Sequence, residues 1–107
     1  MLGKLEEFTI LGVMEAGRNA TAANVFKAVS ESGGASAFGA VFTTLDRLEA
    51  KKYVKASERL VQTGTGEKSR KVYEVTGLGH KVLRESLSVT SSLAAKAGFS
   101  WSFAEGC

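Results

Sequence analysis

The chain has 107 residues, of which 44% are hydrophobic, and a formal net charge of +3. This length supports one hydrophobic core and not two, with roughly two thirds of the unfolded surface buried on folding. The only cysteine, Cys107, cannot form an internal disulfide, and no apolar run is long enough to span a bilayer. These features exclude disulfide-stabilised and membrane-spanning proteins, and they predict a cytoplasmic location.

The positive charge is concentrated in the middle of the chain. Between Arg47 and Lys71 there are eight lysines and arginines but only three glutamates, whereas the rest of the chain is slightly acidic. Clustered positive charge of this kind is typical of a surface that binds a polyanion.

Two helices are predicted in the first third of the chain. Apolar residues recur every three or four positions over residues 2–16, which indicates a helix that is apolar on more than one side and ends at Gly17. A second helix follows, capped by Asn19 or Thr21, and ends near residues 32–34.

A third helix is expected from about residue 37 to residue 52, with Ser36 as its cap. Its helical spacing assigns five apolar residues to the core side: Phe38, Val41, Phe42, Leu45 and Leu48. The other side is predicted to be small, hydroxylic or basic, without an acid: Ala40, Thr43, Thr44, Arg47 and Lys51.

The remaining elements are a hairpin and a helix. Residues 54–60 and 70–75 show the alternation of half-buried strands, and the polar, glycine-containing segment 61–69 between them predicts a flexible basic tip. Thr76 caps the last helix. The apolar stripe of this helix exceeds what one small domain can cover, so we expect it to form a dimer contact.

This order of elements predicts an α+β, mostly α fold: a winged helix-turn-helix of three helices and a two-stranded β-wing, with a C-terminal dimerisation helix. We expect residues 1–76 to bind DNA, 77–98 to form the dimerisation helix, and 99–107 to be a tail. The third helix would enter the major groove while the wing contacts the backbone. The predicted DNA contacts are Ser36, Ala40, Thr43, Thr44, Arg47, Lys51, Lys68, Arg70 and Lys71.

Three blocks of sequence resemble a known family. LGKLEEFTILGVMEAG, FGAVFTTLDRLEAKKYV and KVYEVTGLGHKVL occur in the order and spacing of the PadR-like winged-helix transcription regulators, particularly the short members with a single C-terminal helix. The resemblance implies a homodimeric DNA-binding repressor in which the last helix pairs with that of its partner, often with help from the first helix. The predicted dimer contacts are Leu5, Phe8, Leu83, Leu87 and Leu93.

Four positions depart from the pattern of that family. Phe42 stands where the family usually has a tyrosine, and Thr21-Ala22 replaces a common tyrosine-glycine pair at the start of the second helix. Lys52 occupies a position that is usually glycine, so a lysine must end the third helix there.

The alternatives to a DNA-binding regulator are a winged-helix protein-interaction module and an enzyme. The segment 63–69 resembles a phosphate-binding loop, but Glu67 interrupts the motif and a strand follows it instead of a helix. His80 has no predicted catalytic or metal-binding partner, so we expect it to face solvent and expect no catalytic residue, metal or cofactor.

The aromatic tail leaves three interpretations open. Phe99, Trp101 and Phe103 alternate along it. They could pack on the dimer, cover a hydrophobic effector pocket, or belong to a disordered end. Beyond this tail, the sequence does not indicate a small-molecule effector.

Overall fold

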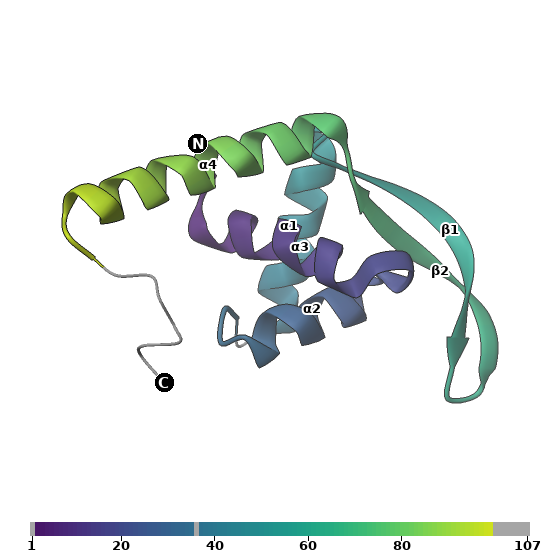
Figure 1. The fold of residues 1–107 in the computed structure, drawn as a ribbon. Coiled ribbons are helices and arrows are strands. Elements are labelled where there is room, and N and C mark those ends of the chain that lie inside the picture. Colours follow the sequence, from purple (N-terminus) through teal and green to yellow (C-terminus); the bar gives the residue numbers. More distant parts are fainter. Residues whose placement is uncertain (1, 36, 100–107) are drawn as a thin grey trace.

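A computed structural model describes residues 2–35 and 37–99, and it confirms the predicted fold class (Figure 1). Three helices pack together, a hairpin projects from them, and a last helix runs back from the base of the hairpin past α1. The elements are α1 (Lys4–Ala16), a 3₁₀ turn η1 (Gly17–Asn19), α2 (Ala22–Glu31), α3 (Phe38–Ala50), β1 (Val54–Thr63), β2 (Gly66–Val75) and α4 (Gly77–Lys96).

Threonine hydroxyl groups cap two of the helices, as predicted. Thr21 Oγ1 accepts a hydrogen bond from the backbone N–H of Asn24, and Thr76 Oγ1 accepts one from the N–H of Gly79. Each satisfies a donor that has no partner within the first turn of its helix. The predicted cap of α3, Ser36, lies outside the described residues.

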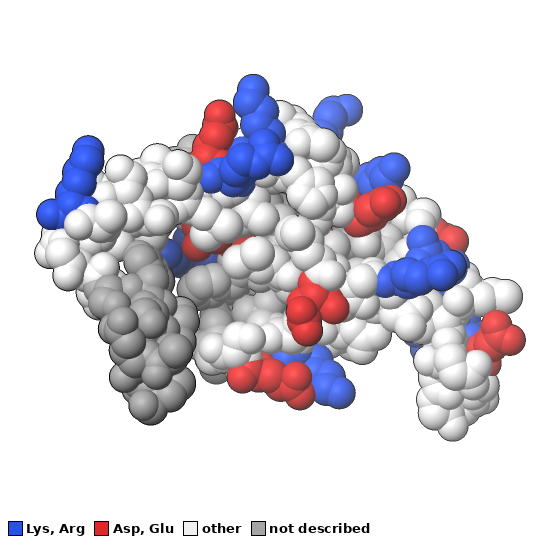
Figure 2. All heavy atoms as spheres, viewed as in Figure 1, with Lys and Arg blue, Asp and Glu red and all other residues white. Residues whose placement is uncertain are grey.

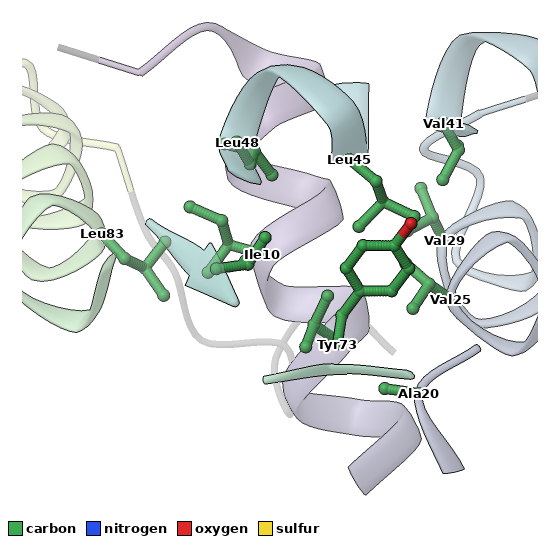
Figure 3. Packing of buried hydrophobic residues seen from close by; sticks show 11 residues of the cluster. Ile10, Ala20, Val25, Val29, Val41, Leu45, Leu48, Tyr73 and Leu83 are labelled. Carbon is green, nitrogen blue, oxygen red and sulfur yellow. The ribbon is translucent and has the colours of Figure 1, made fainter. Parts of the chain in front are cut away.

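The core lies where the four α-helices meet the base of the hairpin (Figure 3). Ile10 of α1 lies at its centre with no exposed surface. Tyr73 of β2 and Leu83 of α4 close the cluster from the hairpin and from the last helix. The side chains from α2 and α3 are mostly branched aliphatic: Val25, Val29, Val41, Leu45 and Leu48.

The hairpin is longer than the sequence predicts. Antiparallel pairing runs from Val54 opposite Val75 to Thr63 opposite Gly66, so only two residues form the turn. The Thr63 hydroxyl donates to the carbonyl oxygen of Gly66 at 2.6 Å and closes the tip. The prediction of a flexible tip over residues 61–69 is therefore wrong, because most of that segment is paired strand.

Within the described part of the chain, the buried residues of α4 all lie in the first half of the helix. Gly79, Leu83 and Ser86 are buried, and the Ser86 hydroxyl donates to Glu7 of α1 at 2.9 Å. Leu83 is 5% exposed and lies in the core, so little of its side chain is available for the predicted dimer contact. No described helix has the length and apolar character needed to cross a bilayer. The described chain ends at Phe99, so Trp101, Phe103 and Cys107 lie outside it.

Lys52 joins α3 to the hairpin in a left-handed backbone conformation, with φ of 66°. The N–H of Tyr53 donates to the carbonyl of Leu48, and that of Lys52 to the carbonyl of Glu49, which is the Schellman pattern of a helix end. The same pattern ends α2 at Gly33, with φ of 83°. At residue 52 the chain therefore places a lysine where the backbone favours glycine.

Candidate nucleic-acid interface

The buried side of α3 is centred differently from the prediction. Val41, Leu45 and Leu48 are fully buried, as expected, but Thr44 is buried with them. Its hydroxyl donates to the carbonyl of Ala40 at 2.7 Å. The prediction that Thr44 lies on the outer side is therefore wrong, because the buried strip runs along the 41–44–48 line of the helix.

Phe38 and Phe42 are each 44% exposed, so the prediction that both lie on the core side is wrong. They form the end of a row of rings that begins at Phe26 of α2. The ring centroids of Phe26 and Phe38 are 5.7 Å apart in an edge-to-face contact, and those of Phe38 and Phe42 are 5.9 Å apart. The rings are thus held against each other at the edge of the core.

One flank of α3 is attached to α1. Lys51 Nζ donates to Glu6 Oε2 at 2.7 Å, and this hydrogen bond, opposed by partial burial of the carboxylate, lowers the pKa of Glu6. Arg47 is exposed nearby and lowers the same pKa through its charge. Lys51, a predicted DNA contact, therefore already has a carboxylate partner within its own subunit.

The opposite flank of α3 is attached to the wing. Lys71 Nζ of β2 lies 3.0 Å from Glu49 Oε1 and 5.4 Å from the centre of the Tyr73 ring. The hydrogen bond to Glu49 raises the pKa of Lys71, and the charge of Asp46 adds to the effect. Asp46 is exposed, so the expectation of an outer side without an acid is wrong. These contacts place α3 and β2 at one surface.

The hairpin carries a basic pair of which the sequence alone assigned only one member, Arg70, to the site. Arg59 and Arg70 lie directly opposite each other in the two strands. Arg59 donates to the backbone carbonyl of Arg18, and Arg70 to that of Ser69. Strand register brings these arginines together, and the predicted loop over residues 61–69 left the register of the two strands undefined. Lys68 is exposed two positions beyond this pair in the ladder, opposite Val61.

A groove of about 420 Å³ lies between the start of α2 and the wing, and one residue of α3 reaches it. Phe42 lines it from α3, Arg70 and Lys71 line it from β2, and residues 21–24 line it from the start of α2. We call it the α3–wing groove. Its walls combine an aromatic ring, basic side chains and the N-terminus of a helix, which are groups suited to a base edge, to phosphate oxygens and to an anion, respectively.

The remaining charged side chains are more evenly mixed. In the view of Figure 2, basic and acidic groups alternate over α4 and the hairpin without forming a surface of one sign. His80 is exposed, as predicted. Residues 2–35 and 37–99 contain no group of three side chains suited to binding a metal ion.

Several solved structures have the same fold as this chain. One is a PadR family regulator from Eggerthella lenta DSM 2243, with 22% sequence identity and a TM-score of 0.65, covering 84% of this chain and 77% of that one. A PadR family regulator from hypervirulent Clostridium difficile R20291 has 18% identity and a TM-score of 0.67, covering 88% of this chain and 97% of that one. A PadR-like regulator from Bacillus cereus strain ATCC 14579 has 17% identity and a TM-score of 0.66, covering 88% of this chain and 87% of that one. At these identities the likeness shows the fold. Among curated proteins there is no significant match.

The family follows from a separate comparison. Residues 10–85 match the model of the transcriptional regulator PadR-like family. This match extends from α1 through the wing into α4, so it includes α3 and the α3–wing groove. The chain therefore belongs to the PadR-like family of transcriptional regulators, a family of DNA-binding proteins and not a class of enzymes.

Proposed function

We propose that this chain is a homodimeric repressor that binds a roughly palindromic DNA operator. The observation that carries the proposal is the contact between Glu49 and Lys71, which joins the exposed side of α3 to the basic wing. A helix in the major groove and a wing on the backbone could then meet the same duplex. Residues 1–76 would supply this surface in the cytoplasm.

The proposed DNA contacts fall into two groups. On α3, Ala40, Thr43 and Arg47 are exposed and would face the base edges, with Arg47 able to donate to a guanine or to a phosphate. On the wing, Lys68, Arg70 and Lys71 would neutralise phosphates. Thr44 is no longer proposed because it is buried. Lys51 stays in the proposal as a phosphate contact, because its ion pair with Glu6 leaves 44% of its side chain exposed, much as the pair with Glu49 leaves Lys71 exposed.

The proposed dimer contact is the uncovered second half of α4. The subunit buries the inner side of this helix as far as Ser86, and beyond that point Leu87 and Leu93 are exposed. Leu5 and Phe8 of α1 are half-buried and would extend the contact. A two-fold dimer would place two copies of α3 in major grooves about one helical turn apart, or ~10 base pairs.

Salt dependence tests the DNA-binding proposal. We expect the affinity for DNA to fall by about 10³- to 10⁵-fold between 50 and 200 mM salt, which corresponds to about 6 to 10 neutralised phosphates per dimer. Fluorescence anisotropy would measure this with the DNA upstream of the gene and with a random duplex of the same length. Arg70→Ala should make the salt slope shallower.

The rival function, a protein-interaction module, gives a different result in the same experiment. An interaction module would bind the two duplexes equally and weakly, with little dependence on salt. A flat salt series, or the absence of any preference for the upstream DNA, would contradict a sequence-specific repressor.

The ion pair between Glu49 and Lys71 predicts a variant with tighter binding. Glu49→Gln removes a negative charge beside the proposed DNA surface, so Lys71 no longer has to give up an ion pair in order to neutralise a phosphate. We expect affinity to rise by about fivefold at low salt, and the salt slope to steepen by roughly one phosphate contact. Anisotropy titrations over a salt series would measure both quantities.

The matched control is Glu74→Gln. Glu74 is likewise a glutamate paired with a lysine, since it lies 3.5 Å from Lys55, but it belongs to β2 and does not line the α3–wing groove. We expect little change in DNA affinity from this variant. Equal gains from both substitutions would show that net charge matters and that the position of Glu49 does not.

A further inference from the structure

Packing of the core does not explain why two phenylalanines of α3 are exposed. Phe42 is 44% exposed, although its helix buries Val41 and Leu45 completely. It lines the α3–wing groove, whereas Phe38 does not. A large aromatic ring exposed in a groove among polar and basic groups is typical of a contact surface for a partner.

The position of the Phe42 ring is fixed from behind. Phe38 packs against Phe42 on one side and against Phe26 on the other, with centroid distances of 5.9 and 5.7 Å. Phe26 itself is partly buried against the core. The row therefore holds the exposed ring in place before any partner arrives.

The surroundings of Phe42 identify the partner as DNA. Arg70 and Lys71 line the same groove from the wing, so the ring has positive charge beside it. A polyanion with an apolar group on its accessible edge fits this combination. In the major groove of DNA, that apolar group is the C5-methyl group of thymine, which side chains such as phenylalanine contact directly.

We propose that Phe42 reads the C5-methyl group of thymine in the operator half-site, and that Phe38 and Phe26 position it. This inference rests on the proposed DNA-binding function and names the base that the groove recognises. The exposed residues near Phe42 on α3 include Thr43, which is compatible with either base pair, and Arg47, which suits guanine. Ala40 and the methyl group of Thr43 are also exposed and can contact a thymine methyl group, so variants of Phe42 are needed to assign the contact to the ring.

Replacing thymine by uracil tests the proposal, because the exchange removes only the methyl group. The probe is a duplex obtained by in vitro selection with the full chain from a random library. Each thymine of this duplex is replaced in turn by deoxyuridine, and affinity is measured by anisotropy. We expect at least one position in the recognised half-site to lose about fourfold in affinity, the factor for one buried methyl group.

The variants assign that loss to one side chain. Phe42→Ala and Phe42→Gln should bind the thymine duplex more weakly and should show no penalty for uracil at that position. Glutamine is a good helix former, so it tests the contact without weakening α3. Met14→Ala is the control, because Met14 is similarly exposed, at 46%, but lies on α1 outside the groove. It should keep the full uracil penalty.

Three results would overturn the proposal. The first is that no replacement of thymine by uracil lowers the DNA affinity of the natural chain. The second is that a uracil replacement lowers the affinity of both Phe42 variants as much as that of the natural chain. In either case a steep salt dependence would still stand, so the DNA-binding function would survive. The third is selection that enriches no sequence, which would also contradict the proposed sequence-specific repressor.

Discussion

Replacing Gly79 with alanine is expected to lower the free energy of unfolding by about 3 kcal/mol, at the upper end of the range for overpacked sites. A Cβ atom at this position would lie 2.0 Å from the carbonyl oxygen of Tyr53. Neither group can move easily, because one is in the first turn of α4 and the other is backbone. A thermal melt at fixed protein concentration should show a fall in Tm of at least about 12 °C.

The carbonyl of Tyr53 explains why the site cannot relax. It accepts a hydrogen bond from the N–H of Thr76 at 3.0 Å, while the Thr76 hydroxyl donates to the adjacent carbonyl of Lys52 at 2.7 Å. Moving the Tyr53 carbonyl away from a methyl group would break its bond to Thr76 and would disturb the cap that begins α4. Gly79 therefore allows the first turn of α4 to contact the backbone at Tyr53, in the segment between α3 and β1.

Gly77→Ala is the matched control for this prediction. Gly77 lies in the same turn of the same helix, but a Cβ atom there would meet nothing within 4 Å. Alanine is the better helix former, so we expect no loss of stability and a gain of up to about 1 kcal/mol. Equal destabilisation by the two substitutions would show that the close contact at Gly79 is not the cause.

Replacing Leu93 with aspartate is expected to turn the proposed dimer into a monomer. Leu93 is 62% exposed in the single subunit, so the change should leave the fold of each chain intact. In a two-fold dimer it removes two buried leucines and places two carboxylates in an apolar contact. We expect the dissociation constant of the dimer to rise by about two orders of magnitude or more. Sedimentation velocity over a concentration series would measure it.

Leu60→Asp provides the control for the dimer prediction. Leu60 is exposed to a similar degree, at 65%, but lies on the wing. Its replacement introduces the same charge without touching α4, so the dimer should persist. Circular dichroism of both variants would verify that the helices are retained. If the Leu93→Asp variant still sediments as a dimer, the dimer contact does not lie on the second half of α4.

The parts of the fold that depend on neighbouring residues could be predicted from the sequence. The Thr21 and Thr76 caps are examples, because a cap involves residues only three positions apart. The orientation of α3 was predicted less well. Helical spacing identifies an apolar side of the helix, but neighbouring elements decide which strip is buried. The core lies along Val41, Thr44 and Leu48, which leaves Phe42 outside.

The contacts that define the candidate site are long-range and could not be predicted. Lys51 and Glu6 are 45 residues apart, and Lys71 and Glu49 are 22 apart. Nothing in the sequence distinguishes these two lysines from the other basic residues near the middle of the chain. The pairing of Arg59 with Arg70 was also missed, because the predicted hairpin was too short to define its register.

The two ion pairs on opposite flanks of α3 have a consequence for how the protein meets its target. Rotation of this helix about its own long axis would expose the fully buried Val41, Leu45 and Leu48, and it would also separate Lys51 from Glu6 and Glu49 from Lys71. The angle at which α3 presents its side chains is therefore set in the free protein. Less conformational freedom remains to be lost on association, and docking should approach that of rigid bodies.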